Sequence, residues 1–318
     1  MTTCSTDYSN FWENVKYIAQ VLYLAPPAIL YIRILHVIWG KYKSVYSQHQ
    51  FFVIYSIDSV VGLLLLLLDI FITRLFVYLP QLCLPASRFF LSHPFLMDLY
   101  YPLLNYLHCA QPLIQIFLTT NRMSSVLFPV DHNKIWKRKL PLIALFIAFT
   151  PFLFIWDTII SPKIAVYYFG GFFMIGTNKV KWANVSLFLF TIRSIAVGIT
   201  VFSTSMMFVK MSKMTKRLKR SEKTLCLACA VNSACFMVPS FFEALATFYE
   251  PYGSSWINYL IQPFAWDVLN VGSPIIMIFV SSQLRHHVFS RTKSQSTTTQ
   301  SAVLTLSGTQ LQRNSSLT

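Results

Sequence analysis

The sequence has few charged residues, and acidic ones are the scarcest. Only 12% of its 318 residues are charged and 55% are hydrophobic, whereas soluble domains carry about 25% charged residues. A water-soluble fold of this length would need more polar side chains to cover its surface. The composition therefore excludes an ordinary soluble enzyme or binding domain and predicts a protein whose solvent is mostly lipid.

The shortage of acidic residues leaves a strongly positive chain. Eleven Asp and Glu stand against 26 Lys and Arg, for a net charge of +15. The basic residues lie in short clusters between apolar stretches and do not gather on one folded basic domain. This distribution argues against nucleic acid as a partner.

Cysteine is also scarce, and its spacing is not that of a metal site. Six cysteines occur, and Cys226 and Cys229 form a CxxC inside an apolar run, without a second pair or a nearby histidine. We therefore expect no zinc site, no redox site and no cofactor. His286 and His287 lie on the polar C-terminal segment, away from any acidic partner, so we expect no enzymatic activity either.

The N-terminus lacks the cationic start and short apolar core of a cleavable signal peptide. What the chain does have is seven apolar runs, each long enough to cross a bilayer as a helix of roughly 20 residues. The sequence therefore predicts an all-α membrane protein, a seven-transmembrane helix bundle over 17–284, with segments 1–16 and 285–318 outside it. The predicted spans are 17–39, 50–74, 95–121, 141–160, 184–209, 224–248 and 257–281.

The basic clusters predict the orientation of these spans. With the N-terminus outside, the inner connectors and tail hold 17 Lys and Arg and the outer segments hold five. Lys and Arg are retained on the cytoplasmic side of membranes. We therefore expect an extracellular N-terminus and a cytoplasmic C-terminus, with Arg122 at the cytoplasmic end of the third span.

A polar stripe runs along one face of the third span, where the residues between its members are largely Leu, Ile, Phe and Ala. Polar groups facing lipid cost several kcal/mol each, so this face must meet other helices or a water-filled crevice. Single members can simply join helices, but the whole stripe indicates a central helix lining an outer cavity. The members are Tyr101, Asn105, His108, Pro112, Gln115, Thr119 and Arg122.

Charged residues inside the other spans must be paired or protonated. Arg193 can pair with Glu243 or Asp267, and Asp58 can meet Asn270 through water. Two prolines are expected to kink their helices, and either kink can be a hinge or static: Pro239 and Pro274.

The third inner connector, 210–223, holds seven Lys and Arg. We expect it to bind anionic lipid and an acidic cytoplasmic partner, chiefly through Lys213, Lys216 and Arg217. Segment 282–289 is expected to form a short amphipathic helix on the inner membrane surface. The Ser- and Thr-rich tail beyond it can be phosphorylated and then bind a basic, arrestin-like regulator.

Three stretches carry a resemblance to a known family. FFVIYSIDSVVGLLLL (51–66), LTTNRMSSVLFP (118–129) and PSFFEAL in the sixth span are similar to the nematode serpentine chemoreceptors of class gamma, which are themselves like G-protein-coupled receptors. The resemblance implies a receptor for sensory perception and chemotaxis in the plasma membrane, including the ciliary membrane of sensory neurons. It also implies coupling to a heterotrimeric G protein, with Arg122 matching the arginine of the acidic-Arg-aromatic motif. Asn270 and Pro274 echo an Asn-Pro motif.

The chain departs from the wider receptor pattern at two places. The residue before Arg122 is Asn121, so the usual local ion pair is missing. The connector 161–183 contains no cysteine, so the usual disulfide from the third helix cannot form. Cys4 and Cys83 are both predicted on the oxidising side and can pair instead.

Two functions remain in competition at this point. In the first, a small organic or lipid-like ligand enters the outer crevice, and helices moving at Pro239 and Pro274 open an inner cleft at Asn121 and Arg122. The alternative is a ligand-gated ion channel or transporter, disfavoured by nine glycines, no filter-like sequence and no repeat. The residues expected around the ligand are Tyr101, Asn105, His108, Trp156, Glu243, Trp266 and Asp267.

Overall fold

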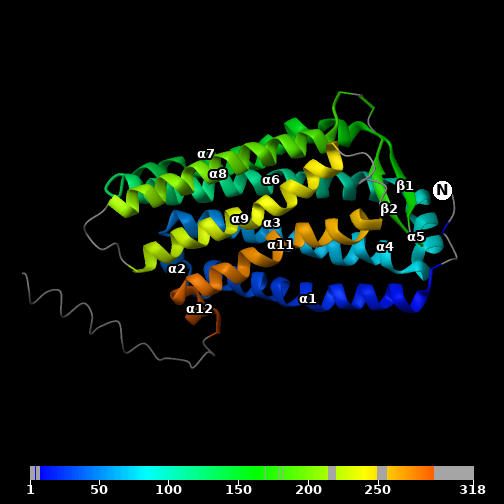
Figure 1. The fold of residues 1–318 in the computed structure, drawn as a ribbon, viewed down its shortest axis with the longest axis horizontal. Helices are drawn as coiled ribbons and strands as arrows, with labels where there is room; N and C mark the ends of the chain where they lie inside the picture. The colour runs from blue at the N-terminus through cyan, green and yellow to red at the C-terminus, as the bar shows by residue number, and fades with distance from the viewer. Residues whose placement is uncertain are drawn as a thin grey trace, which may run out of the picture. The chain divides into compact units, whose positions relative to one another are not determined.

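The computed structural model describes Cys4 and residues 8–168, 170–177, 179–180, 182–213, 220–248 and 256–289. Long helices running side by side dominate this part of the chain (Figure 1). They are α1 (Asn10–His36), α3 (Gln50–Leu68), α6 (Pro94–Leu127), α7 (His132–Ile160), α8 (Val185–Lys213), α9 (Arg220–Phe248) and α11 (Trp256–Val280). Each contains or overlaps one of the predicted spans.

Short elements extend or join these helices. Two π-helical turns, η1 (Val37–Lys41) and η2 (Asp69–Arg74), continue α1 and α3. The others are α2 (Lys43–Tyr46), α4 (Leu75–Tyr78), α5 (Pro80–Ser92), α12 (Ser282–Phe289) and the strands β1 (Lys163–Tyr168) and β2 (Gly171–Gly176). We call the end with α5, β1 and β2 the hairpin end, and the opposite end, where α6 finishes, the Arg122 end.

Several helices are longer than the apolar runs predicted. Helix α1 begins at Asn10, and α6 continues five residues past Arg122. Helix α7 begins at His132, so Lys134, Lys137 and Arg138 occupy helical turns and not a connector. The helices extend beyond the predicted spans because Lys and Arg are good helix formers, so an apolar run predicts the part of a helix that crosses the membrane and not where the helix ends.

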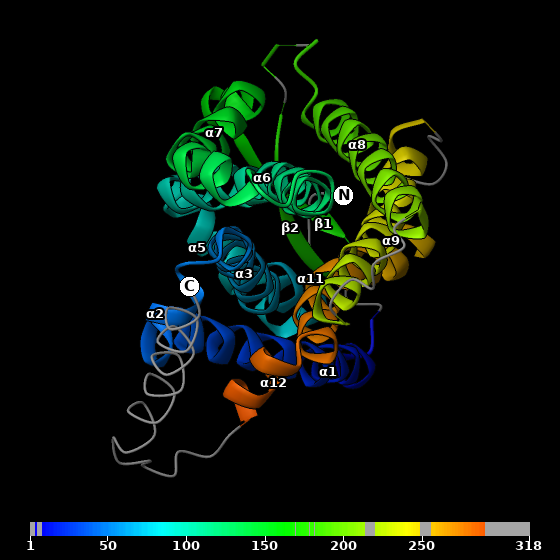
Figure 2. The same ribbon diagram turned by 90° about the vertical axis from the view of Figure 1, so that its left-hand side faces the viewer.

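Six helical segments in the described residues are long and apolar enough to cross a membrane: Asn10–Lys41, Gln50–Tyr78, His132–Ile160, Val185–Lys213, Leu227–Leu245 and Pro263–Val280. Helix α6 is not among them, since its polar stripe lowers its hydropathy. It packs against α3, α7, α8 and α9, and the view along the bundle places it among them (Figure 2). A helix enclosed by protein can carry polar groups that a lipid-facing helix cannot.

The apolar surface is arranged as in a membrane protein. Large apolar side chains are exposed along α7, among them Leu142, Phe149 and Leu153 at 65–71%. A soluble protein would not leave such a stripe in water. Inside the bundle, the largest buried cluster lies toward the Arg122 end and includes Ile34, Ile114 and Met277.

The predicted connector 161–183 contains an antiparallel hairpin that sequence reasoning missed. Strands β1 and β2 pair in register, with Val166 opposite Phe173. Gly170 in the turn has φ 93°, a conformation that side chains disfavour. At Gly171, an added Cβ would lie 2.2 Å from the carbonyl oxygen of Val77. Glycine there lets the hairpin rest directly on α4.

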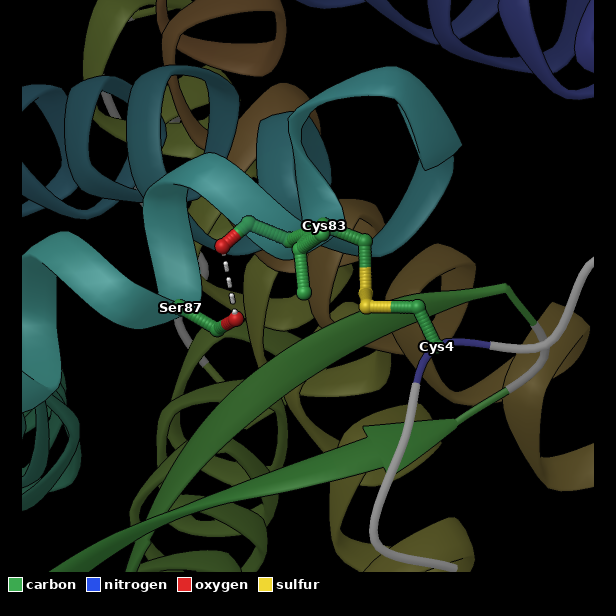
Figure 3. Close-up of a disulfide and its surroundings, with 4 residues drawn as sticks. Cys4, Cys83 and Ser87 are labelled. Atoms are coloured by element: carbon green, nitrogen blue, oxygen red, sulfur yellow. Dashed lines mark hydrogen bonds between the residues drawn. A yellow bond between two sulfur atoms is a disulfide. The ribbon is translucent and has the colours of Figure 1, made fainter.

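A disulfide fixes the N-terminal segment at the hairpin end. Cys4 and Cys83 of α5 are bonded, with their Cα atoms 6.2 Å apart (Figure 3). Cys83 is fully buried in one cluster with Phe172 and Met174 of β2. The Ser87 hydroxyl donates to a carbonyl of the preceding turn of α5. The bridge therefore holds the N-terminal segment beside the hairpin.

Candidate functional site

A cavity of about 410 Å³ lies at the hairpin end of the bundle, within the size range of small-molecule sites. Its walls come from η2, α4, α6, β2, α8, α9 and α11. Of the predicted ligand residues, five line it: Tyr101, Asn105, His108, Glu243 and Trp266. Much of the remaining wall is aromatic, including Phe76, Tyr100 and Phe172.

Two predicted ligand residues lie outside the lining. Trp156 is half-buried and packs on Trp182, with ring centroids 5.8 Å apart. Asp267 lies behind the wall, bonded to Arg74. The sequence did not predict this, because a shift of one helical position changes which way a side chain points and an apolar helix such as α7 has no pattern that shows which face is inward.

Arg74, the last residue of the predicted span 50–74, is the centre of a buried ionic cluster. Its Nε donates to Asp69, Nη1 donates to the Gln20 amide oxygen at 2.8 Å, and Nη2 donates to Asp267 at 2.7 Å. Nη1 also donates to the Tyr23 hydroxyl at 2.7 Å, and Nη2 to the Pro263 carbonyl at 3.4 Å. All the donors of the guanidinium are therefore used, and Arg74 is only 1% exposed.

A second buried pair crosses the cavity wall. Arg193 of α8 donates to Glu243 of α9, which is one of the two partners the sequence suggested. The other suggested partner, Asp267, pairs with Arg74 instead. Arg193 Nη2 also lies 3.4 Å from His108 Nδ1. A guanidinium can only donate, so Nδ1 must be an acceptor and the His108 ring is neutral.

Below the cavity, the polar stripe of α6 bonds to three other helices. Asp58 accepts from Gln115 at 3.2 Å and from Ser273 at 3.1 Å. Gln115 in turn accepts from Asn232 of α9 at 2.7 Å. Asn270, which the sequence linked to Asp58 through water, accepts directly from Gln111 at 2.6 Å. Helical spacing predicted the stripe. It could not predict the partners of the stripe, because they lie on helices far apart in the sequence.

The prolines expected to kink helices lie where predicted along the chain. Pro239 is inside α9 and Pro274 is inside α11. Each belongs to a helix that bonds to α6: Asn232 of α9 donates to Gln115, and Asn270 of α11 accepts from Gln111. Ser273 of α11 donates to Asp58 of α3, which also accepts from Gln115. Movement at either proline would therefore change these contacts.

Arg122 packs on an aromatic ring. Its guanidinium carbon is 3.6 Å from the centroid of the Phe51 ring of α3. The neighbouring Asn121 is fully buried, and its amide has no hydrogen-bond partner among the described residues. Arg122 thus has a cation–π contact with Phe51, whereas in the acidic-Arg-aromatic motif the arginine has an acidic neighbour in the sequence. Lys213 is exposed at the end of α8; Lys216 and Arg217 lie outside the described residues.

The predicted helix at 282–289 is confirmed as α12, which packs back on the bundle through Leu284 and Val288. His287 stacks on Tyr42 with ring centroids 3.9 Å apart, and its Nδ1 shares a 2.8 Å hydrogen bond with the Tyr46 hydroxyl. Burial, then the charges of His286 and Lys41, lower the pKa of His287. Burial raises the pKa of Tyr46 to about 12. The contact is thus made by two neutral side chains.

A bundle of apolar helices, closed by a hairpin over a small-molecule cavity and built on a central polar helix, defines a multi-pass membrane protein of the receptor type. The comparisons agree. Residues 17–288 match the model described as Srg family chemoreceptor. Serpentine receptor class gamma-9 of Caenorhabditis elegans is 70% identical over 285 residues, covering 90% of this chain and 85% of the relative.

Other relatives from the same organism extend this result. Serpentine receptor class gamma-8 is 61% identical, with 90% of each chain covered. Serpentine receptor class gamma-2 is 42% identical, with 90% of this chain and 88% of the relative covered. The chain belongs to the Srg family of chemoreceptors, as the sequence motifs predicted. These relatives are named as receptors and not as enzymes.

Proposed function

We propose that this chemoreceptor binds a small organic or lipid-like ligand in the cavity at the hairpin end and passes the signal to a heterotrimeric G protein at the Arg122 end. In this proposal α6 is the seventh span, the hairpin end is extracellular and the C-terminus is cytoplasmic. The receptor acts at the plasma membrane, including the ciliary membrane of sensory neurons.

The observation that carries the proposal is the series of polar contacts that α6 makes with other helices between the cavity and Gln115. His108 lines the cavity, Gln111 bonds to α11, and Gln115 bonds to α3 and α9. Arg122 follows at the far end of the same helix. A ligand that prefers one arrangement of α9 and α11 would shift the population of these contacts, and only that difference in affinity can produce the shift.

The test is the substitution Arg122→Ala. Because the arginine lies far along α6 from the cavity residues, the variant is expected to keep ligand binding but to lose G-protein activation. The measurement is nucleotide exchange in cells that express a promiscuous G protein, screened against odorants and pheromones. Arg88→Ala, an exposed change on α5, should leave exchange intact. Normal ligand-driven exchange by Arg122→Ala would refute the proposed coupling.

The ring under Arg122 provides a second prediction. If the stack on Phe51 holds Arg122 in the resting bundle, Phe51→Leu should raise exchange without ligand. A cation–π contact is worth about 1–2 kcal/mol, so the expected rise is roughly 5- to 30-fold. Phe52→Leu removes an equally buried ring that is not stacked under Arg122, and basal exchange should stay low. Equal basal rates for the two variants would contradict the stack's role.

The other partners follow from charge. Lys213 and the basic residues at the start of α7 suit anionic lipid. The proposed docking of an arrestin-like regulator involves the tail beyond 289, which lies outside the described residues. The channel or transporter alternative gains no support from the buried charges, because Asp69, Asp267 and Glu243 are each bonded to a buried arginine, Arg74 or Arg193.

A further inference from the structure

Among the residues that the structure describes, the cavity wall and the groups bonded to it carry one more negative charge than positive charge. Two guanidinium groups, Arg74 and Arg193, are present. Three carboxylates accept from them: Asp69, Asp267 and Glu243. His108 adds no charge, since its Nδ1 accepts from Arg193.

The excess negative charge lies in the Arg74 cluster, where one guanidinium group is bonded to two carboxylates. Both carboxylate oxygens of Asp267 accept from Arg74 Nη2, and one of them also accepts from the Tyr23 hydroxyl. The Asp267 side chain is 7% exposed. Asp69 accepts from Nε, and its side chain is 20% exposed. Asp69, unlike Asp267, lines the cavity. The carboxylate with incomplete compensation is therefore the one that a ligand can reach.

The positive groups of the site are not open to an anion in the same way. All the donors of Arg74 are occupied by protein oxygens, as described above. Arg193 is 3% exposed and engages Glu243 and His108. An anionic ligand would meet the more exposed Asp69 carboxylate, and it would have to compete with Glu243 for the buried Arg193. Both effects oppose the binding of an anion.

The rest of the wall suits a cation with an apolar body. Aromatic residues from four elements line the cavity, and aromatic rings attract positive charge through their faces. They include Tyr78 of α4, Tyr101 of α6, Phe172 of β2 and Trp266 of α11. A carboxylate at one wall surrounded by aromatic rings is an arrangement that recognises ammonium groups.

We infer that the ligand of this cavity is a small organic cation, an amine or quaternary ammonium compound with an apolar body, whose charge pairs with Asp69. The inference rests on the proposed function, in which the cavity is the ligand site. It adds the chemical class of the ligand, which the proposed function leaves open between neutral, acidic and basic molecules.

The test uses the purified full-length receptor and two matched series of probes: phenethylamine, phenethyl alcohol and hydrocinnamate, and octylamine, octanol and octanoate. The measurement is the shift of the melting midpoint with probe concentration at neutral pH. The amines should act at roughly 10- to 100-fold lower concentration than the alcohols, as expected for a hydrogen bond to a charged group. The carboxylates should produce no shift.

Asp69→Asn should remove the advantage of the amines over the alcohols. Asp98→Asn, at an exposed carboxylate on α6 that pairs with Lys163, should keep it. The comparison of probes on the unsubstituted receptor stands even if Asp69→Asn does not fold. Amines that act no better than alcohols, or carboxylates that act best, would overturn the cationic ligand and leave the cavity as the binding site. Whether the receptor couples to a G protein is measured separately, with the Arg122→Ala variant.

Discussion

Replacing Arg74 with methionine is expected to abolish the folded receptor. The substitution leaves Asp69 and Asp267 buried without their cation, and removing one partner of a buried ion pair costs about 3–5 kcal/mol. Most proteins have a stability of only about 5–15 kcal/mol, so little folded protein should remain. The measurements are surface expression and the melting midpoint of the detergent-solubilised protein.

Two further variants separate charge from size in this experiment. Arg88→Met makes the same change at an exposed position of α5 and should leave the midpoint unchanged. Adding Asp267→Asn to Arg74→Met removes one orphaned carboxylate and should restore part of the lost stability. If Arg74→Met melts like the unsubstituted protein, the cluster does not stabilise the hairpin end.

The Arg193–Glu243 pair is expected to show strong coupling between its two members. Arg193→Met or Glu243→Leu alone should each cost about 3–5 kcal/mol, because each leaves a buried charge without its main partner. The double variant should be more stable than either single one, since a buried ion pair replaced by apolar residues of similar size is often neutral.

A double-mutant cycle in melting experiments measures this coupling directly. The contact between Asp98 and Lys163 is the control, because its acidic partner is 55% exposed although the Lys163 side chain is 2% exposed. Solvent screens a pair with an exposed partner, so its coupling should be smaller than that of Arg193 and Glu243. If the costs of the two substitutions at Arg193 and Glu243 simply add, the two side chains do not act as a pair.

Sequence reasoning found the helices and missed the elements that close the cavity. Apolar run length is a direct consequence of bilayer thickness, so each long helix was predictable. The hairpin was not, because it lies in a connector where no membrane imposes a pattern. Its signals were nonetheless present: the β-branched and aromatic residues around Val166 and Phe173, separated by the glycines 170 and 171.

The ionic cluster shows a different limit. Asp69 and Arg74 are five residues apart, a spacing that separates side chains on a regular α-helix. The π-helical turn η2 spans these two residues, and they are paired in the folded chain. No local rule of sequence indicates that turn, so Arg74 seemed to be a boundary residue. By contrast, the sequence predicted Glu243 as one of two possible partners of Arg193, because both residues lie within apolar runs and therefore need a partner of opposite charge.

The Arg74 cluster has a mechanical consequence. It joins Gln20 and Tyr23 of α1, Asp69 of η2 and Asp267 of α11 through a single side chain. Away from the hairpin end, α1, α3 and α11 meet through apolar side chains such as Ile34, Phe51 and Met277 and through the hydrogen bond from Ser273 to Asp58. Arg74 is thus a single attachment point for α1, η2 and α11, so the loss of this one side chain would loosen three elements at the cavity wall together.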